Sequence, residues 1–511
     1  MTAGRQPDQI RGDRMRADQI RGDRIPADRI PADRLRTDRI PADWIRTVCE
    51  QALAAHDCPS VSVAVVERGE VVLAEAFGLA DIASGRPATP ATVYGLASVT
   101  KPFTAAAVRR TADEGLLDLD APVPMPVPGH HSAALGPQLA HPAPTHRQLL
   151  SHRAGLAPYY DFHYLDEDRP RAPRIDPAPY LGQVRAPGTD FAYANLGYLL
   201  AARELERSTG RSLADVVREK VCAPLGLDSW HLGDSHRDTY PGPAPTAVRY
   251  TSDGRAYPSY TVSHPGATLG WATAADTALF ASVHGQLAAA EDGLRELGTV
   301  TPHLGYGLGW CVSTGPGPRI LSHGGGGPGV AAFTASVPEL ELAVAVLCNS
   351  TDKAARDAVV AELLGELVPG FGPEQISPVA SEPGDGREPR LPESGKWTGS
   401  LATPEGELPA VLTLGTDGHA VLEVADERAE AIATASSTGS PSGGLRADFP
   451  LQLPTLDARI NSPRLALVLN PGSATGATDA TLEGLAHAYK AGDREGRLGA
   501  FLSHRCVLRR D

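Results

Sequence analysis

The chain has 511 residues, more than one typical domain holds, so two or three structural units are expected. Its formal net charge of −14 disfavours nucleic acid and anionic membranes as partners, and no apolar run approaches the roughly 20 residues of a membrane-spanning helix. The N-terminal residues contain no apolar signal segment, and the six cysteines form no Cys-x-x-Cys pair. We therefore expect a cytoplasmic protein with free thiols.

The first stretch of the chain is repetitive. Residues 8 to 47 repeat with a period of five, and each unit has aspartate first and an apolar residue third. This period fits neither an α-helix nor a β-strand, and arginine and proline flank the apolar position where a pentapeptide solenoid would carry small residues. We predict a disordered, low-complexity leader over residues 1–43 with no catalytic role.

Helix and strand patterns begin after this leader. Apolar residues recur at helical spacing over 44–56, and two strand-like runs at 61–66 and 71–76 then predict a hairpin. The stretch 95–108 predicts a turn followed by a mostly apolar helix, with Ser98 at its N-cap.

That helix carries the first candidate catalytic pair. Ser98-x-x-Lys101 places a hydroxyl and an amine on one helical face, one turn apart. Burial at a helix N-terminus lowers the pKa of a lysine, and a partly neutral lysine can take the proton of a serine nucleophile. The sequence has only five lysines, and arginine, which cannot act as a base, supplies most of its positive charge. This usage favours a catalytic pair over an N-cap serine followed by an ordinary lysine.

Three later stretches are punctuated by special residues. Residues 121–146 are rich in proline, glycine and histidine, and they predict a surface loop, because no carboxylate or His-x-His grouping suggests a metal site. Tyr193-x-Asn195 leads into an amphipathic helix to about residue 208 and, taken locally, is a turn tyrosine with an N-cap asparagine. A glycine run after His323 interrupts strand-like sequence, and glycine lets the backbone pass close to a ligand.

The last part of the chain changes character. A short helix is predicted over 354–367, and residues 369–393 are dominated by proline, glycine and glutamate, which is typical of a linker. Short β-prone segments then alternate with turn residues to the C-terminus, so we predict a small antiparallel barrel or sandwich over 394–511.

Three of these motifs occur in an order that resembles a known enzyme group. Ser98-x-x-Lys101, Tyr193-x-Asn195 and His323-Gly-Gly325 resemble the three motifs of class C β-lactamases, D-alanyl-D-alanine carboxypeptidases and related serine esterases. The resemblance covers roughly residues 45 to 367. It implies an α+β fold in which an antiparallel sheet flanked by helices lies beside an all-helical lobe, with the serine in the cleft, as a β-lactamase-like serine hydrolase domain over 44–368.

The resemblance also implies a role for each motif residue. Ser98 would be the nucleophile that forms an acyl-enzyme, while Lys101 and Tyr193 would share general-base and general-acid duty. Asn195 would position Lys101 and hydrogen-bond the amide of the substrate. No metal or cofactor is implied.

The third motif departs from the β-lactamase pattern. Its members His323, Gly324 and Gly325 would bind substrate, and the backbone N–H groups of Ser98 and Gly326 would form the oxyanion hole. Many β-lactamases have Lys-Thr-Gly here, which supplies a permanent charge and a hydroxyl for the substrate carboxylate. Histidine and glycine lack both, so we expect weak β-lactam hydrolysis.

The C-terminal part has a resemblance of its own, to the lipocalin-like domain of penicillin-binding-protein-type thioesterases, which release and cyclise nonribosomal peptides. The shared stretches are Trp397-Thr-Gly399, Thr403-Pro-Glu-Gly406, Thr481-Leu-Glu-Gly484 and Leu502-Ser-His504.

The two resemblances leave three functions open. The leading hypothesis is a serine hydrolase or acyltransferase that cleaves an ester or amide of a small-molecule or peptide acyl substrate. The alternative is a stand-alone cyclase that takes a peptidyl thioester, with a peptidyl carrier protein as partner. The third is a catalytically silent penicillin-binding sensor, which would acylate without turnover.

Overall fold

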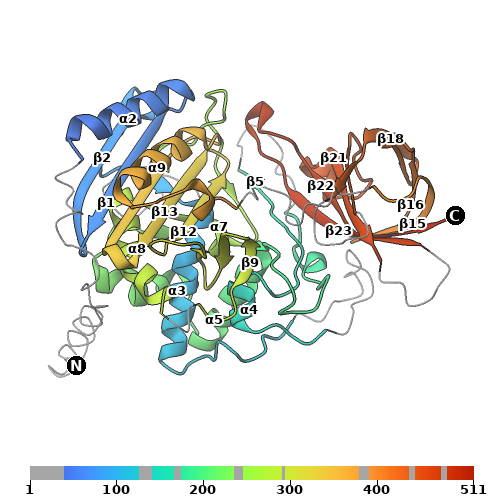
Figure 1. Cartoon of the computed structure of the whole chain (residues 1–511), viewed down its shortest axis with the longest axis horizontal. Coiled ribbons are helices and arrows are strands. Elements are labelled where there is room, and N and C mark those ends of the chain that lie inside the picture. Colours follow the sequence, from blue (N-terminus) through green and yellow to red (C-terminus); the bar gives the residue numbers. More distant parts are fainter. Residues whose placement is uncertain are drawn as a thin grey trace.

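The computed structural model describes residues 40–125, 141–165, 174–234, 245–290, 294–378, 391–436, 444–472 and 480–511 (Figure 1). Nearly all of the predicted leader and the middle of the predicted linker lie outside these residues, as does most of the histidine-rich stretch. Within the described part, no helix combines the length and the apolar character needed to cross a membrane.

A nine-stranded antiparallel sheet forms the centre of the first part, in the order β3-β2-β1-β14-β13-β12-β11-β10-β9. Its strands are β1 Ser60–Glu67, β2 Glu70–Asp81, β3 Arg86–Pro87, β9 Gly298–Thr301, β10 Leu304–Tyr306, β11 Cys311–Ser313, β12 Leu321–Gly327, β13 Val330–Val337 and β14 Leu342–Cys348. At the centre of the sheet, β1 pairs with β14, which comes last in the sequence, and Val61 lies opposite Cys348. The predicted hairpin is confirmed as β1 and β2.

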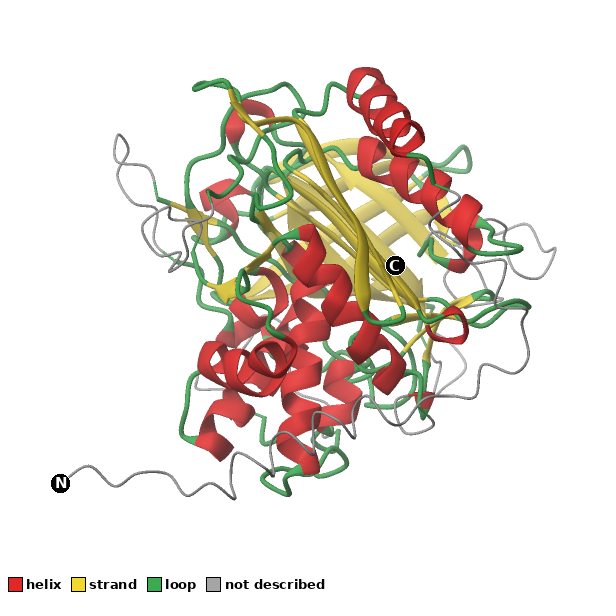
Figure 2. Cartoon of the chain, turned by 90° about the vertical axis from the view of Figure 1, so that its left-hand side faces the viewer, coloured by secondary structure: helices red, strands yellow, loops and turns green. Residues whose placement is uncertain are grey.

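Helices cover both faces of this sheet, which explains why the central strands β1 and β14 are buried along nearly their whole length rather than at every second residue (Figure 2). Val63 and Val65 of β1 pack with α2 (Ala42–Ala55) and α9 (Ala354–Leu367). Ala64 and Val66 belong to the core cluster on the opposite side, which contains α8 (Ala274–Ala288). Both helices predicted from periodicity in this region, at 44–56 and 354–367, are therefore confirmed.

The remaining helices of the first part gather into a lobe beside the sheet (Figure 2). They are α3 Thr100–Asp113, α4 His146–Leu150, α5 Asn195–Thr209, α6 Leu213–Val217 and α7 Pro265–Thr268. Two small sheets join the lobe to its surroundings: β4 Tyr94–Gly95 with β8 Gly270–Ala272 and β6 His231–Leu232, and β5 His163–Tyr164 with β7 Tyr260–Thr261.

The C-terminal part is a second nine-stranded antiparallel sheet, in the order β18-β17-β16-β15-β23-β22-β21-β20-β19. It curls until β18 lies against β20, which nearly closes a barrel around a leucine-rich interior (Figure 1). Its strands are β15 Gly395–Thr403, β16 Gly406–Leu414, β17 His419–Val424, β18 Glu427–Ile432, β19 Thr434–Ser436, β20 Gly444–Phe449, β21 Arg464–Pro471, β22 Thr481–Tyr489 and β23 Phe501–Arg510. The predicted α+β fold with a small all-β barrel is confirmed.

Candidate active site

Ser98 lies on a tight turn between β4 and α3. The turn is the short 3₁₀ helix Ala97–Val99, and the N-cap of α3 is Val99, so the prediction that Ser98 caps the helix is wrong. Thr100 fixes the turn instead, because its hydroxyl donates to the carbonyl of Ala97 at 2.6 Å and accepts from the N–H of Gly270 at 2.9 Å. The hydroxyl of Ser98 is thereby left for chemistry.

Lys101 lies one turn further along, and its side chain is fully buried. Its Nζ is 3.0 Å from Ser98 Oγ and 3.0 Å from the carbonyl oxygen of Ala267 in α7. Burial lowers the pKa of the Lys101 amine well below its ordinary value, and no nearby carboxylate opposes that shift. The geometry therefore favours a neutral amine that can accept the serine proton.

Tyr193 also lies next to Ser98. Its hydroxyl forms a hydrogen bond with Ser98, and its ring centre lies 4.7 Å from the Nζ of Lys101. Burial raises the pKa of the Tyr193 hydroxyl, although the hydrogen bond to Ser98 partly opposes this. Tyr193 is therefore protonated at neutral pH and can pass a proton between the hydroxyl of Ser98 and a leaving group.

Asn195 is the first residue of α5, and its Nδ2 donates to the carbonyl oxygen of Tyr159 at 2.9 Å. Its Oδ1 is buried and has no hydrogen-bond partner among the described residues. Since the hydrogen bonds of Lys101 go to Ser98 and Ala267, the free Oδ1 is an acceptor available to an incoming N–H group.

The third motif lies within strand β12, which passes directly over the turn that carries Ser98. The prediction that the glycine run interrupts the strand is wrong. Strand β12 pairs residue by residue with β13 from Leu321 to Gly327. The approach is so close that a Cβ at Gly325 would lie 2.2 Å from the carbonyl oxygen of Leu96. Only glycine allows this contact.

His323 of this motif is a neutral side chain. Burial lowers the pKa of its imidazole to about 3, and any positive charge on the nearby Lys101 acts in the same direction. Its Nδ1 lies 2.8 Å from the carbonyl oxygen of Gly324, and its Nε2 lies 2.8 Å from the hydroxyl of Tyr306. The first nitrogen therefore donates and the second accepts, so this motif holds no permanent positive charge.

The sequence interpretation missed two residues of the site. Tyr306 of β10 orients His323, and His152 packs its ring 4.2 Å from Tyr193 and 4.7 Å from Tyr306. His152 has a left-handed φ of 57°, and its Nδ1 accepts from the N–H of Ala194 at 3.1 Å. No local pattern marks Tyr306, whereas a non-glycine residue in that conformation cannot be recognised from sequence at all.

A cleft of about 800 Å³ opens from this site. One side is the catalytic group with the glycines of β12, and the other side is α9 with the segment 371–378. This second side is mainly apolar but includes the ammonium group of Lys353, one of the five lysines of the chain. Lys353 belongs to none of the sequence motifs, and only the scarcity of lysine in this chain distinguishes it in the sequence.

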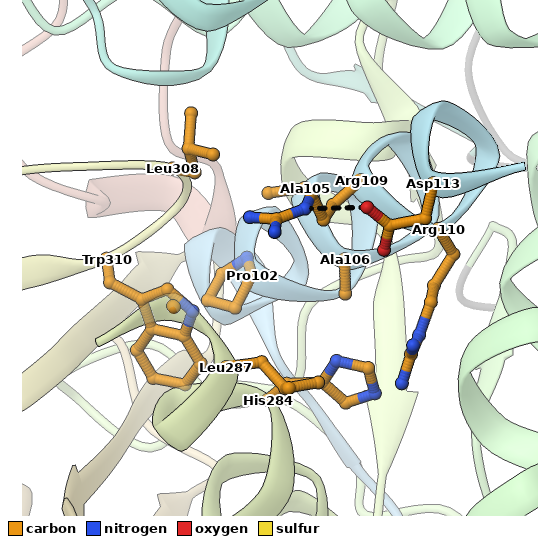
Figure 3. A pocket seen from close by; sticks show the side chains of 11 residues that line it. Pro102, Ala105, Ala106, Arg109, Arg110, Asp113, His284, Leu287, Leu308 and Trp310 are labelled. Atoms are coloured by element: carbon orange, nitrogen blue, oxygen red, sulfur yellow. Dashed lines mark hydrogen bonds and ion pairs between the residues drawn. The ribbon is translucent and has the colours of Figure 1, made fainter. Parts of the chain in front are cut away.

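A second, smaller pocket of about 60 Å³ lies further along α3 (Figure 3). Arg109 and Asp113 pair at its edge, and His284 and Trp310 form its floor. Its lining includes no serine, cysteine or lysine, so we do not assign the reaction to it.

Comparisons with known proteins identify the family to which the first part of the chain belongs. A family model described as Beta-lactamase matches residues 45–368. A D-aminopeptidase of Cereibacter sphaeroides is 28% identical over 384 residues, which cover 70% of each chain. Penicillin-binding protein 4 of Amycolatopsis lactamdurans is 28% identical over 364 residues, covering 64% of this chain and 90% of that protein.

A solved structure extends the likeness of fold to the barrel. The crystal structure of SurE matches with a TM-score of 0.58 at 22% identity, over 90% of this chain and 98% of that one. The motif geometry and the family match over 45–368 together show that the chain is a serine hydrolase and belongs to the Beta-lactamase family.

Proposed function

We propose that the protein cleaves a peptide-like ester or amide through an acyl-enzyme on Ser98, in the manner of class C β-lactamases. The observation that carries the proposal is the 3.0 Å contact between Ser98 Oγ and the Nζ of a fully buried Lys101. An amine with a depressed pKa, held at hydrogen-bond distance from a hydroxyl, is a competent general base.

Ser98 Oγ attacks the substrate carbonyl while its proton passes to Lys101, and the backbone N–H groups of Ser98 and Gly326 stabilise the oxyanion. The bond to the leaving group then breaks, and the leaving group takes a proton delivered through Tyr193. Water or an amine next attacks the ester on Ser98, gives up its proton to the same groups, and releases the acyl product.

Two features support a peptide as the acyl donor. The cleft of about 800 Å³ is large enough for several residues, and the apolar residues of its segment 371–378 can accept side chains. The similarity to a protein named D-aminopeptidase supports a substrate that contains a D-residue. The neutral His323 in turn supports weak activity on β-lactams.

The first experiment is product analysis by mass spectrometry. The protein is given a peptidyl thioester with a free amine and a C-terminal D-residue, beside a simple aryl ester. We expect the linear acid, which identifies water as the acceptor. A product lighter by one water would identify the peptide's own amine and make the protein a cyclase, whereas a stoichiometric adduct without turnover would make it a sensor. Absence of both adduct and product would contradict the proposal.

Two variants test the assigned roles. Ser98→Ala removes the nucleophile and should abolish the acyl adduct, and Lys101→Arg should lower the acylation rate by roughly 10³-fold, because arginine keeps the charge but cannot act as a base. Lys396→Arg, at an exposed barrel lysine, is the matched control and should leave the rate unchanged. An acyl adduct of normal yield in Ser98→Ala would place the nucleophile elsewhere.

A further inference from the structure

A seven-residue segment, Pro158–Tyr164, lies between the barrel and the active site, and we call it the strap. In Figure 1 its last two residues form β5, which lies between the first sheet and the barrel. The strap forms hydrogen bonds with the barrel on one side and with residues next to the active site on the other.

The barrel holds the strap at both ends and in the middle. Tyr160 and Phe501 exchange two backbone hydrogen bonds, of 3.1 and 2.8 Å, in an antiparallel bridge. The hydroxyl of Ser503 donates to the carbonyl oxygen of Pro158. At the other end the hydroxyl of Tyr164 lies 3.0 Å from the carbonyl oxygen and 2.8 Å from the N–H of Leu498.

The topology of the barrel leaves a place for the strap. Strand β22 pairs with residues 501–509 of β23, but β15 pairs only with residues 506–510 of β23. The start of β23 therefore has one edge without a barrel partner, and the strap occupies that edge at Phe501. The backbone N–H and C=O groups of an exposed strand edge need hydrogen-bond partners. The bridge between Tyr160 and Phe501 supplies them and fixes the register of the strap on β23.

A hydrogen-bond chain on the outer face of the barrel supports this edge. The ring of His487 lies with its Nδ1 2.9 Å from Ser503 Oγ, and burial lowers the pKa of this imidazole to about 3. Because Ser503 donates its own proton to Pro158, its oxygen accepts from the neutral His487. Ser503 is therefore held in one orientation by His487 of the neighbouring strand β22.

The strap holds the active site on its other side. The carbonyl oxygen of Tyr159 accepts from Asn195 Nδ2 at 2.9 Å. The buried carboxylate of Asp161 accepts from the N–H and hydroxyl of Ser263, at 3.1 and 2.9 Å. Ser263 lies just before α7, whose Ala267 carbonyl accepts from Lys101 at 3.0 Å. The strap therefore contacts Asn195 directly, and it contacts the segment that leads into α7 and the carbonyl of Ala267.

We propose that the barrel is a positioning part of the catalytic unit: by clamping the strap, Ser503 and its neighbours on β23 set the positions of Asn195 and of the α7 turn. Ser503 and Tyr164 are then positioning residues that act through Tyr159 and Asp161. The proposal rests on the proposed function only where it concerns rate. Its structural half, the coupling of barrel, strap and site, holds for any reaction at Ser98.

The test uses the full chain and two independent variants. Ser503→Ala removes the hydrogen bond to Pro158, and Tyr164→Phe removes the contacts with Leu498. We expect each to lower kcat on the aryl ester at least fivefold while KM changes less than twofold, and Ser503→Thr to restore the rate. Trp397→Phe is the matched control. It removes a 3.3 Å hydrogen bond from the buried barrel side chain of Trp397 to the backbone carbonyl of Glu393, and it does not alter the strap.

Hydrogen–deuterium exchange supplies a readout that does not depend on activity. In Ser503→Ala and Tyr164→Phe we expect faster exchange over 158–164, 193–197 and 263–268, with no change there in Trp397→Phe. If the wild type forms no acyl adduct, the proposed function fails while this exchange pattern still decides the coupling. Unchanged exchange at 193–197 and 263–268 in both variants, or equal effects in Trp397→Phe, would overturn the proposal. If Ser503→Ala does not fold, Tyr164→Phe alone decides.

Discussion

The residues around Ser98 are arranged so that titratable groups stay neutral. Burial lowers the pKa of the Lys101 amine and of the His323 imidazole, and it raises the pKa of the Tyr193 hydroxyl. A neutral amine, a neutral ring and a protonated phenol can exchange one proton with little change in net charge. The site is thus suited to proton transfer and does not itself provide a fixed charge for recognising an anion.

Lys353 provides such a charge at the edge of the cleft. A Cβ at Gly326 would lie 2.8 Å from its Nζ, so the ammonium group lies beside the strand that a bound peptide would follow. The neighbouring Arg356 is already committed, because its guanidinium donates to the carbonyls of Gly325 and Ala332, each at 3.0 Å. Among the described residues, the Nζ of Lys353 has no hydrogen-bond partner, so it is available to a substrate carboxylate.

We therefore expect Lys353→Met to discriminate between two forms of one substrate. When the leaving group ends in a free carboxylate, kcat/KM should fall about tenfold, which corresponds to one charge-assisted hydrogen bond. When the same leaving group ends in a carboxamide, kcat/KM should stay within about twofold. Steady-state kinetics on the pair measures this, with Lys396→Met as control. An equal loss on both substrates would show that Lys353 supports the fold of the cleft instead.

At the scale of elements, the position of β12 over the Ser98 turn is the most demanding feature. Successive residues of a strand face opposite sides, so Gly325 faces the turn while Gly324 and Gly326 face α9. A Cβ at Gly324 would meet Arg356 Nη1 at an ordinary 3.7 Å, whereas one at Gly325 would meet the backbone of Leu96 at 2.2 Å. There is therefore room for a side chain at Gly324 but none at the adjacent Gly325.

This difference predicts that Gly325→Ala lowers the acylation rate by at least 100-fold, because β12 must move away from the turn that carries Ser98 and Gly326 moves with it. Gly324→Ala should retain the rate within about threefold. Burst kinetics of acyl-adduct formation measures both variants, and the thermal unfolding midpoint shows whether each is folded. Equal rates in the two variants would mean that the close approach to Leu96 is not needed for chemistry.

The sequence allowed most elements of the fold to be predicted, and the misses have physical causes. The helix at 354–367 and the β1–β2 hairpin follow from apolar periodicity, which depends only on neighbouring residues. The glycines of β12 have no side chains and so carry no strand pattern, and it is the pairing with β13 that makes them a strand. Ser98 was placed one position wrongly because Thr100, not Ser98, secures the turn.

At the scale of the whole molecule, what local sequence cannot show is the contact between distant parts. Ser503 and Pro158 are separated by 345 positions, and no periodic pattern links them. The buried apolar side chains of the helical lobe and of the barrel nevertheless form one contiguous cluster, from Phe103 of α3 to Leu467 of β21. The motif residues of the site could be predicted from their order, whereas the strap beneath them required the structure.

Buried histidines give the whole molecule a predictable response to acid. Burial lowers the pKa of six imidazoles of the described residues from the ordinary 6.5 to about 3 or 4: His231, His264, His284, His323, His487 and His504. In the unfolded chain these rings take up protons below pH 6.5, whereas in the folded protein they stay neutral to about pH 4. Their contribution to stability is therefore complete above pH 6.5 and is lost as the pH falls from 6.5 toward 4.

We expect the free energy of unfolding to fall between pH 7 and pH 5, each buried histidine contributing about 2 kcal/mol to that loss. His284 is the clearest test, since its ring stacks on Phe280 at 4.8 Å and the nearby Arg110 also disfavours its protonation. His284→Phe should reduce the difference between the urea midpoints at pH 7 and pH 5, whereas His419→Phe, at an exposed barrel histidine, should not. A wild-type urea midpoint that is the same at both pH values would mean that these histidines take up protons without unfolding, because water reaches rings that the structure places in the core.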